Sequence, residues 1–277
     1  MQGDKAGESY WSGVWSETQL NARIDIENAP LTNHVLQVWH EYYRDLFSKI
    51  PIKGRSLLEV GCGNSVWMGY FNQYHGINVN GMDYSPQGCE MSKMIFKRDG
   101  IEGEIFQADL FNPPPDCLEK FDVVCSFGVV EHFENTAETI KSLLKLLKPG
   151  GLLITSVPNL MGVSGWLQKI TNKPVYDIHV PIDLSLLKNA LKEAGTEIVD
   201  IRYYLSASLF ANLEPVEGTT VNHKFIKKLF LKPFSLFTFF VWWLERNFGF
   251  QFPANKMLAG GIISVAKKPL KKTGKDQ

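Results

Sequence analysis

Short apolar runs alternate with amphipathic segments along most of the chain. The runs predict strands over residues 57–60, 77–83, 104–108, 121–127, 152–157, 197–204 and 257–266. Between them, apolar residues recur at helical spacing in segments 32–50, 66–74, 86–99, 136–147 and 183–194. Strands that alternate with helices in this rhythm predict an α/β fold with a doubly wound, mainly parallel sheet. Functional residues are expected beyond the carboxyl ends of such strands.

Polar residues in capping positions support these boundaries. Thr32, Asn135 and Asp183 each stand at the start of an amphipathic segment, where a side-chain oxygen can accept from a free backbone N–H group. Ser85 is followed by a proline, which is the usual order of an N-cap and the first helical position. We therefore expect helices to begin at these points.

Residues 57–65, Leu-Leu-Glu-Val-Gly-Cys-Gly-Asn-Ser, predict a buried strand that ends in a glycine turn and continues into a helix. Such a turn aims backbone N–H groups at one spot, and Gly61 and Gly63 let a ligand approach where a Cβ would block it. The dinucleotide fingerprint needs a third glycine, which residues 64–66 do not supply. Glu59 offers a carboxylate to a cationic group. A positively charged, nucleotide-like cofactor is therefore favoured over a diphosphate.

Further polar residues follow the neighbouring strands. Asp83 lies about twenty residues past the glycine turn, where βαβ units place a carboxylate that binds the ribose hydroxyls. A turn or capping aspartate is the competing interpretation. Tyr84 is then expected beside the adenine, as a stacking face or as packing. Because Glu59, Asp83, Asp109 and Phe127 all end predicted strands, they are expected to meet at one edge of the sheet.

Three segments resemble the class I S-adenosylmethionine-dependent methyltransferases. They are Leu-Glu-Val-Gly-Cys-Gly at 58–63, Gly-Val-Val-Glu-His-Phe at 128–133, and Pro-Gly-Gly at 149–151. The pattern covers roughly residues 33–206 and 257–267, and it is nearest to the small-molecule branch that includes ubiquinone-type O-methyltransferases. The resemblance implies a Rossmann-like methyltransferase fold, S-adenosyl-L-methionine as the cofactor, and a last strand that runs antiparallel between the fifth and the sixth.

The resemblance also implies roles for single residues. An aspartate in the position of Asp109 usually accepts from the adenine amino group of the cofactor, although aspartate at a strand end is also a common turn former. The expected cofactor-binding residues are Glu59, Gly61, Cys62, Gly63, Asp83, Tyr84, Asp109, Leu110 and Phe127. No metal site is expected, because the chain has Phe127-Gly128 where ubiquinone-type relatives place an additional acidic residue.

Methyl transfer makes modest demands on catalytic groups. The sulfonium methyl group is attacked in line and a neutral thioether leaves, so the protein has to align the two reactants and exclude water. A hydroxyl acceptor also needs a base, and His132 and His179 are the candidate catalytic residues. For His132 a structural role competes, because the Glu-His pair occurs in family members with different acceptors.

Composition limits the classes of binding partner that we expect. Lys and Arg together number 29, as do Asp and Glu, so net charge gives no argument for nucleic acid. The four cysteines lie far apart and suggest neither zinc nor disulfides. The polar start of the chain, Met1 to Ser9, carries no apolar signal core, so a cytoplasmic protein is expected.

Two regions fall outside the common pattern. Residues 8–31 contain Tyr10, Trp11 and Trp15 without clear periodicity, which predicts an irregular arm whose aromatic residues either cover a ligand or anchor the arm. About fifty residues stand between the last two strands, where the family normally has a turn.

This insertion is rich in Phe and Trp and is flanked by lysines. Its core, Phe234 to Leu244, is too short to span a bilayer, and Lys232-Pro233 interrupts the apolar run on the N-terminal side of this core. Its only polar stripe is Ser235, Thr238 and Glu245, so most of its surface needs an apolar neighbour. The neighbour is the substrate pocket, a second subunit or a membrane interface, and the insertion is expected to roof the acceptor site. The basic tail from Lys267 to Gln277 is expected to be disordered.

The sequence thus predicts four parts and one principal function. The parts are an N-terminal arm and helix at 1–50, a cofactor-binding core at 51–206, an aromatic cap at 207–256, and a last strand with its tail at 257–277. The predicted function is transfer of a methyl group from S-adenosylmethionine to a small hydrophobic or lipid-linked acceptor. The alternatives are a methyltransferase-like protein that binds the cofactor without turnover, and a nicotinamide-dependent reductase, against which the missing third glycine argues.

Overall fold

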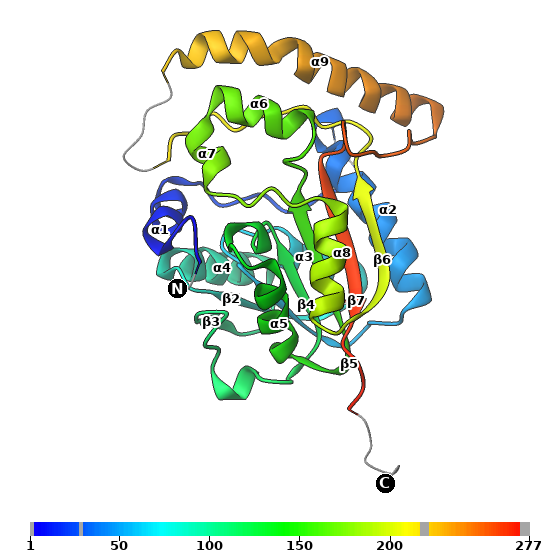
Figure 1. Ribbon diagram of the computed structural model, residues 1–277. Helices are drawn as coiled ribbons and strands as arrows, with labels where there is room; N and C mark the ends of the chain where they lie inside the picture. The colour runs from blue at the N-terminus through cyan, green and yellow to red at the C-terminus, as the bar shows by residue number, and fades with distance from the viewer. Residues whose placement is uncertain (1–2, 28–29, 217–221, 272–277) are drawn as a thin grey trace.

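A seven-stranded sheet forms the centre of the molecule (Figure 1). The computed structural model describes residues 3–27, 30–216 and 222–271. In chain order the strands are β1 (Ser56–Val60), β2 (Asn78–Asp83), β3 (Ile105–Gln107), β4 (Phe121–Phe127), β5 (Leu147–Pro158), β6 (Glu197–Tyr204) and β7 (Gly261–Lys267). Their order in the sheet is β3-β2-β1-β4-β5-β7-β6, and only β7 is antiparallel to its neighbours. The predicted fold class and the antiparallel last strand are confirmed.

Helices cover both faces of the sheet. They are α1 (Glu8–Glu17), α2 (His34–Lys49), α3 (Trp67–His75), α4 (Pro86–Asp99), α5 (Thr136–Leu146), α6 (Val163–Thr171), α7 (Lys173–Asp177), α8 (Leu184–Glu193) and α9 (Lys224–Phe248). Adjacent residues of a strand point to opposite faces. Leu57 accordingly packs with residues of α2, α3 and α4, whereas Leu58 packs with residues of α5 and α8. The sheet is therefore buried on both sides, as parallel sheets usually are.

The helix caps explain why most boundaries follow from the sequence. The side chains of Ser85, Asn135 and Asp183 each accept from the backbone N–H three residues later, at 3.1, 3.1 and 2.9 Å. The prediction for Thr32 was wrong, because Thr32 lies inside a short 3-10 turn, η1 (Leu31–Asn33), and α2 begins at His34.

Two predicted strand starts are corrected. The fifth strand begins at Leu147 instead of Leu152, because Leu147 already pairs with Phe121 of β4 and ends the preceding helix one residue earlier. The last strand begins at Gly261 instead of Met257. There the side chain of Asn255 accepts from the N–H groups of Met257 and Leu258 at 3.0 and 3.2 Å, which holds these residues in a turn.

The first part of the N-terminal arm forms a helix, α1, which corrects the prediction of an irregular segment there, whereas residues 18–25 are irregular as predicted. α1 packs beside α4, and the Ser12 and Ser85 hydroxyl groups are hydrogen-bonded at 3.0 Å (Figure 1). The segment before α1 is also fixed, since the Lys5 N–H donates to the His132 carbonyl at 2.9 Å. These contacts join distant parts of the chain, so the local sequence pattern does not predict them.

Four short elements lie between β3 and β4, after β4 and after β5. The segment after β5 carries α6 and α7, where the sequence pattern predicted no element, and 3-10 turns form at η2 (Pro115–Cys117) and η3 (Val130–His132). Of these, η3 matters most for function, because it holds the Glu-His pair just beyond the carboxyl end of β4.

The insertion forms one long helix, α9, which runs through Pro233 without a break. Contacts hold the helix on both sides of the proline: Leu231 packs with Leu209 and Leu213, and the Thr238 hydroxyl accepts from the Leu209 N–H at 3.0 Å. Among the helices described, none unites the length and apolar character that a membrane span requires.

The start of the tail is ordered, contrary to the prediction. Lys267 is the last residue of β7, and the Lys268 Nζ donates to the carbonyls of Leu144 and Leu147 at 2.9 and 2.8 Å. Residues 272–277 of the predicted tail lie outside the described residues, as do the first two residues of the chain.

Candidate functional site

A cavity of about 360 Å³ opens at the carboxyl ends of β1, β2, β3 and β4. Its volume falls within the usual range for small-molecule sites, roughly 300–1,000 Å³. The lining includes eight of the nine predicted cofactor residues, namely Glu59, Gly61, Cys62, Asp83, Tyr84, Asp109, Leu110 and Phe127. The structure therefore brings the predicted residues together at one edge of the sheet, from the ends of four strands.

The ninth residue, Gly63, lies just behind the cavity wall. Gly61 and Gly63 have φ angles of 74° and 27°, which favour glycine. A Cβ on Gly61 would approach Val129 Cγ2 to 2.4 Å, and one on Gly63 would approach Trp15 Cζ2 to 2.7 Å. Both glycines are thus required by close packing of the protein's own side chains.

The N–H groups of the glycine turn donate to acceptors within the protein. Those of Gly61 and Cys62 point to the Met82 carbonyl at 2.7 and 3.2 Å, and that of Gly63 donates to Asp83 Oδ2 at 2.9 Å. The sequence analysis expected these groups to face the ligand, and this expectation is corrected. A diphosphate would need such donors, so their internal use agrees with a cofactor that carries no diphosphate.

Glu59 is the most deeply buried carboxylate of the cavity, with 1% of its surface exposed. Both of its oxygens accept from the Ser65 hydroxyl, at 2.7 and 2.8 Å. Burial raises the pKa of Glu59 to about 8, against the opposing effect of the Ser65 hydrogen bond. A cationic ligand group beside Glu59 would favour the ionised carboxylate, which is the chemistry the sequence predicted for it.

Asp83 is fixed by two backbone donors. Its Oδ2 accepts from the Gly63 N–H at 2.9 Å and its Oδ1 from the Ser85 N–H at 2.8 Å. Burial raises the pKa of Asp83, while these hydrogen bonds lower it. The carboxylate is therefore held at the end of β2 in one orientation, bordering the cavity.

Asp109 and Tyr84 line the same wall further from the glycine turn. The Asp109 Oδ1 accepts from the Phe111 N–H at 2.9 Å, so this aspartate does shape a turn. The Tyr84 hydroxyl donates to Asp4 Oδ2 at 3.2 Å. Tyr84 therefore also connects the cavity to the N-terminal segment, a contact that the sequence did not indicate.

The N-terminal arm covers part of the cavity. Trp11, Trp15 and Asn21 belong to its lining, and the indole rings of the two tryptophans stack at 5.7 Å. Asn21 is tied to the glycine turn, because its N–H donates to Asn64 Oδ1 at 2.9 Å. The sequence analysis assigned none of these three residues to the site, although it noted the aromatic residues of the arm.

The aromatic insertion, which the sequence predicts to roof the acceptor site, does not line this cavity. The cavity is lined by residues between positions 11 and 133, and α1 occupies the place expected for the insertion. α9 lies beyond α6, at the far end of the molecule from the start of β5 (Figure 1). Its apolar surface must therefore serve something other than this cavity.

The two candidate histidines meet beside the cavity. His132 lines the wall, and the centroids of the His132 and His179 rings are 4.5 Å apart. Each ring is oriented by a backbone carbonyl: His132 Nδ1 donates to the Ile178 carbonyl and His179 Nδ1 to the Val175 carbonyl, at 3.0 and 2.6 Å. With Nδ1 as the donor, Nε2 carries the lone pair in each neutral ring.

Burial keeps both rings neutral. It lowers the pKa of His132 to about 4, with a further contribution from His179, and it also lowers the pKa of His179. Next to them, Glu131 is 2% exposed, its Oε2 has no hydrogen-bond partner among the described residues, and burial raises its pKa to about 8. This cluster is thus a proton-accepting imidazole pair beside an undersatisfied carboxyl group.

The same three side chains could also hold a cation. The ligand atoms of Glu131, His132 and His179 all lie within 4.8 Å of one another. Two neutral imidazoles and one carboxylate are a common donor set for divalent transition-metal ions. The sequence analysis considered only the residues before the Glu-His pair and therefore did not include His179 in such a set.

Fold and site together define an α/β enzyme that binds a nucleoside cofactor beside carboxylates. The family described as a methyltransferase domain matches residues 34–201. The ubiquinone biosynthesis O-methyltransferase of Cereibacter sphaeroides is 30% identical over 176 residues, 59% of this chain and 69% of that protein. The corresponding protein of Ruegeria pomeroyi is 29% identical, with coverage of 59% and 68%. The chain belongs to this methyltransferase family.

Solved structures share the fold at low sequence identity. A SAM-dependent methyltransferase from Archaeoglobus fulgidus has a TM-score of 0.52 at 16% identity, and the match covers 85% of this chain and 94% of that one. The [4+2]-cyclase SpnF has a TM-score of 0.57 at 16% identity, with coverage of 98% and 97%. Because these likenesses show the fold alone, the reaction is argued from family and site.

The chain is an S-adenosylmethionine-dependent methyltransferase of the small-molecule type. The recognition, the cofactor and the enzyme class predicted from the sequence are confirmed. The nicotinamide-dependent reductase is set aside by the family match and by the glycine turn described above.

Proposed function

We propose that the enzyme methylates a hydroxyl group on a small, apolar acceptor that enters the cavity beside His132. One observation carries this proposal: a neutral imidazole with its Nε2 lone pair available lies in the wall of the same cavity as Glu59, Asp83 and Asp109. The relatives named O-methyltransferases support a hydroxyl acceptor, and ubiquinone in their names supports an apolar one.

We assign each carboxylate of the cavity to a different part of the cofactor. When bound, S-adenosylmethionine supplies an electrophilic methyl group on a sulfonium sulfur. We assign Glu59 to the ammonium end of the cofactor, since it is the carboxylate nearest the glycine turn in sequence. Asp83 is assigned to the ribose hydroxyls, and Asp109 with Tyr84 and Leu110 to the adenine. Gly61, Cys62 and Phe127 complete the wall.

His132 is the proposed base. Its Nδ1–H is engaged by the Ile178 carbonyl, so its Nε2 is the atom that accepts the acceptor's hydroxyl proton. His179 lies against this ring and lowers its pKa, which favours the neutral form before reaction. We therefore assign His132 to proton removal and His179 to the positioning of His132.

The remaining wall excludes water and selects an apolar acceptor. Trp11 packs edge-on against the His132 ring at 5.0 Å, and Val129 and Phe133 contribute apolar surface to the same wall. A dry environment strengthens the electrostatic interactions of the reacting groups. This lining supports the predicted hydrophobic acceptor, while the cytoplasmic location remains a prediction.

Turnover with a panel of hydroxyl acceptors tests the proposal. Purified protein is incubated with S-adenosylmethionine and phenols or catechols that carry apolar tails of increasing length, and S-adenosylhomocysteine is measured. We expect product formation that depends on the acceptor and rises with the length of the tail. Cofactor binding without turnover on any acceptor would instead support a protein that binds the cofactor without catalysis. Turnover on amine acceptors alone would refute the hydroxyl assignment.

A further inference from the structure

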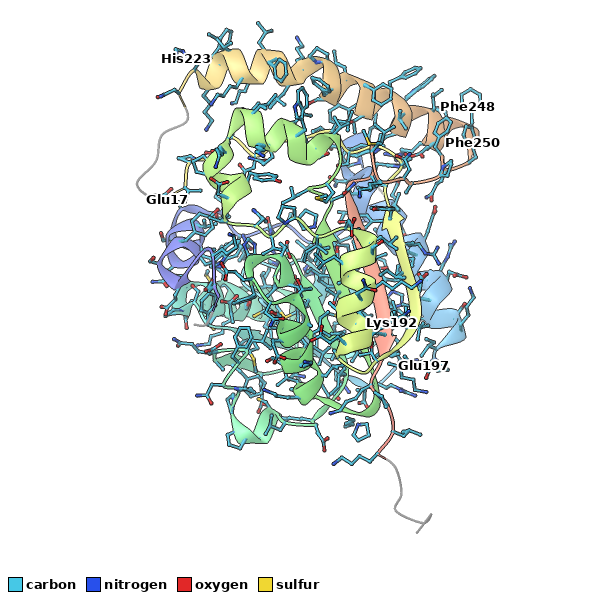
Figure 2. The ribbon with its side chains drawn as sticks, in the orientation of Figure 1. Glu17, Lys192, Glu197, His223, Phe248 and Phe250 are labelled. Carbon is cyan, nitrogen blue, oxygen red and sulfur yellow. The ribbon has the colours of Figure 1, made fainter. Side chains whose placement is uncertain are left out.

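The long helix α9 buries two of its polar side chains and exposes many of its large apolar ones. Thr238 and Glu245 are buried, whereas Phe225, Leu229 and Phe240 are 80%, 60% and 56% exposed. A surface helix of a water-soluble domain normally has the reverse arrangement. Figure 2 shows that many side chains of this helix, between the labelled His223 and Phe248, project away from the rest of the molecule.

The spacing of the residues explains the two faces. The inner face carries Leu231, Thr238, Trp242 and Glu245, and the outer face carries Leu229, Leu236, Phe240 and Trp243. Each set has the same intervals of seven, four and three residues, offset by two positions. Because two positions correspond to about 200° around an α-helix, the sets lie on opposite sides.

Specific hydrogen bonds fix the helix in this orientation. The Trp242 Nε1–H donates to the Ala207 carbonyl at 2.8 Å, and Thr238 accepts from the Leu209 N–H at 3.0 Å. At the other end of the inner face, Glu245 is bonded to His34 at 2.9 Å. The polar stripe predicted from the sequence therefore holds the helix on the rest of the protein. Because these hydrogen bonds fix the orientation of α9, the helix cannot rotate to bury its exposed aromatic face without breaking them.

The exposed surface extends beyond the outer face. Phe230 and Phe237 flank it, Phe248 and Phe250 continue it at the end of the helix and just beyond, and Trp166 of the neighbouring α6 is 53% exposed. The helix is about 37 Å long at 1.5 Å per residue. This is a long, narrow apolar surface at one end of the molecule, and it is larger than the scattered apolar residues that monomers usually expose.

The charged residues beside this surface distinguish between a second subunit and a membrane as its binding partner. Lys228, Lys232 and Arg246 follow one flank of the outer face, and the single acidic residue of the helix, Glu245, is buried. In a symmetric dimer the same patch of each subunit would face the other, so these positive charges would come together. The surface of an anionic bilayer instead attracts the basic residues and also accepts the apolar ones, as it does for helices that lie flat in the headgroup region.

We propose that α9 binds the enzyme peripherally to anionic phospholipid surfaces, with the outer aromatic residues inserted at the level of the headgroups and the flanking basic residues on lipid phosphates. This docking surface consists of Phe225, Leu229, Leu236, Phe240 and Trp243 together with Lys228 and Lys232. The inference does not depend on the acceptor or on the catalytic roles proposed above, because the docking surface and the cavity share no residue.

Co-flotation of the full-length protein with vesicles tests this proposal. We expect binding to vesicles with about one third phosphatidylglycerol, weaker binding to pure phosphatidylcholine, and a decrease with added salt. The triple variant Leu236→Gln/Phe240→Gln/Trp243→Gln should lower the partition coefficient at least tenfold. Lys228→Gln and Lys232→Gln should each lower it about fivefold on anionic vesicles and little on neutral ones.

Matched variants separate docking from general damage. Met94→Gln/Leu118→Gln removes equally exposed apolar residues elsewhere, and Lys49→Gln/Lys97→Gln removes distant charges, so both should bind vesicles like the wild type. Affinity for S-adenosylhomocysteine and Tm should stay unchanged in every variant. Absence of wild-type binding to any vesicle, or equal loss in the matched variants, would overturn the proposal. A wild-type dimer in light scattering that the triple variant abolishes would identify a second copy as the occupant and also overturn it.

Discussion

His132 and His179 lie with their rings 4.5 Å apart, one just after β4 and the other just before α8. Their Nδ1 atoms donate to separate backbone carbonyls, so the two rings are held independently. This arrangement makes each imidazole a neutral acceptor and excludes the free rotation that an exposed histidine has. The local geometry therefore suits a base whose charge state does not change near neutral pH.

Replacing His132 with Gln should lower kcat by roughly 10²- to 10⁴-fold, the range for loss of a general base. Since burial lowers the pKa of His132 to about 4, protonation removes the base only near that pH, and the wild-type rate should stay level from pH 8 to 6. Rates with a hydroxyl acceptor, measured with and without EDTA, check this.

His75→Gln is the control for that experiment, because burial also lowers the pKa of His75 to about 4 but His75 is absent from the cavity lining. It should leave kcat within a few fold of the wild type. An acid limb near pH 6.5, or equal losses in both variants, would contradict the role of His132.

Glu131→Gln should change how stability depends on pH. Folding raises the Glu131 pKa from 4.5 to about 8, so between these values the folded state holds a proton that the unfolded state releases. This contribution is complete below pH 4.5 and is lost as the pH rises towards 8. The Tm of the Gln variant relative to the wild type should therefore increase from pH 5 to pH 8, by roughly 2–4 °C for each kcal/mol.

These melting experiments are carried out in EDTA, because a bound cation would favour the ionised carboxylate. Glu134→Gln, an exposed neighbour, should show a Tm difference that does not vary with pH. The raised pKa of Glu59 affects wild type and variants alike and cancels in the difference. A pH-independent difference for Glu131→Gln as well would show that this carboxyl group is not buried in the neutral form.

Asp83→Ala should weaken binding of S-adenosylhomocysteine roughly 10- to 100-fold, the effect of losing hydrogen bonds to a charged group. Tm should fall modestly as well, since the Gly63 and Ser85 N–H groups lose their acceptor. Calorimetry with S-adenosylhomocysteine and its 2′-deoxy analogue separates the two effects. The wild type should discriminate between the ligands, and the variant should bind both equally.

The control for Asp83 is Asp116→Ala, at an exposed position outside the cavity lining, which should keep the wild-type affinity. Unchanged affinity in Asp83→Ala would contradict the ribose assignment, and so would full discrimination against the deoxy analogue.

Trp15→Ala tests whether the N-terminal arm covers the cofactor. Trp15 stacks on Trp11 and lies against Gly63, so its removal should loosen the arm and speed dissociation of S-adenosylhomocysteine about tenfold in stopped-flow experiments. Tyr10→Ala removes an aromatic residue of the same helix that does not line the cavity, and should have little effect. Tighter binding in Trp15→Ala would show that this ring competes with the ligand for space.

Local signals predicted most of the fold. Ser85, Asn135 and Asp183 begin their helices because a cap depends only on neighbouring residues. β4 matched its prediction, Phe121–Phe127, because a strand buried on both faces is a continuous apolar run. The carboxylates of the cavity could also be located from local signals, since each one lies at or just beyond the carboxyl end of a predicted strand.

Contacts between distant residues account for what the sequence missed. Nothing near Trp15 indicates that it will lie against Gly63, and nothing near His179 places it beside His132. For α9 the pattern revealed a polar stripe but not its direction. That depends on partners such as His34 and Leu209, which lie far away in the chain.

The pairing of Tyr204 with Gly261 fixes the place where the insertion leaves the sheet and returns to it. These residues stand opposite each other where β6 ends and β7 starts, so the intervening stretch departs from and rejoins the sheet at one place. A tight hairpin would close the same gap without altering the order of any strand. The insertion that carries α9 can thus change in length without altering the strand order, and it leaves the sheet at the same edge as the carboxyl ends of β1, β2 and β4, where the cavity lies.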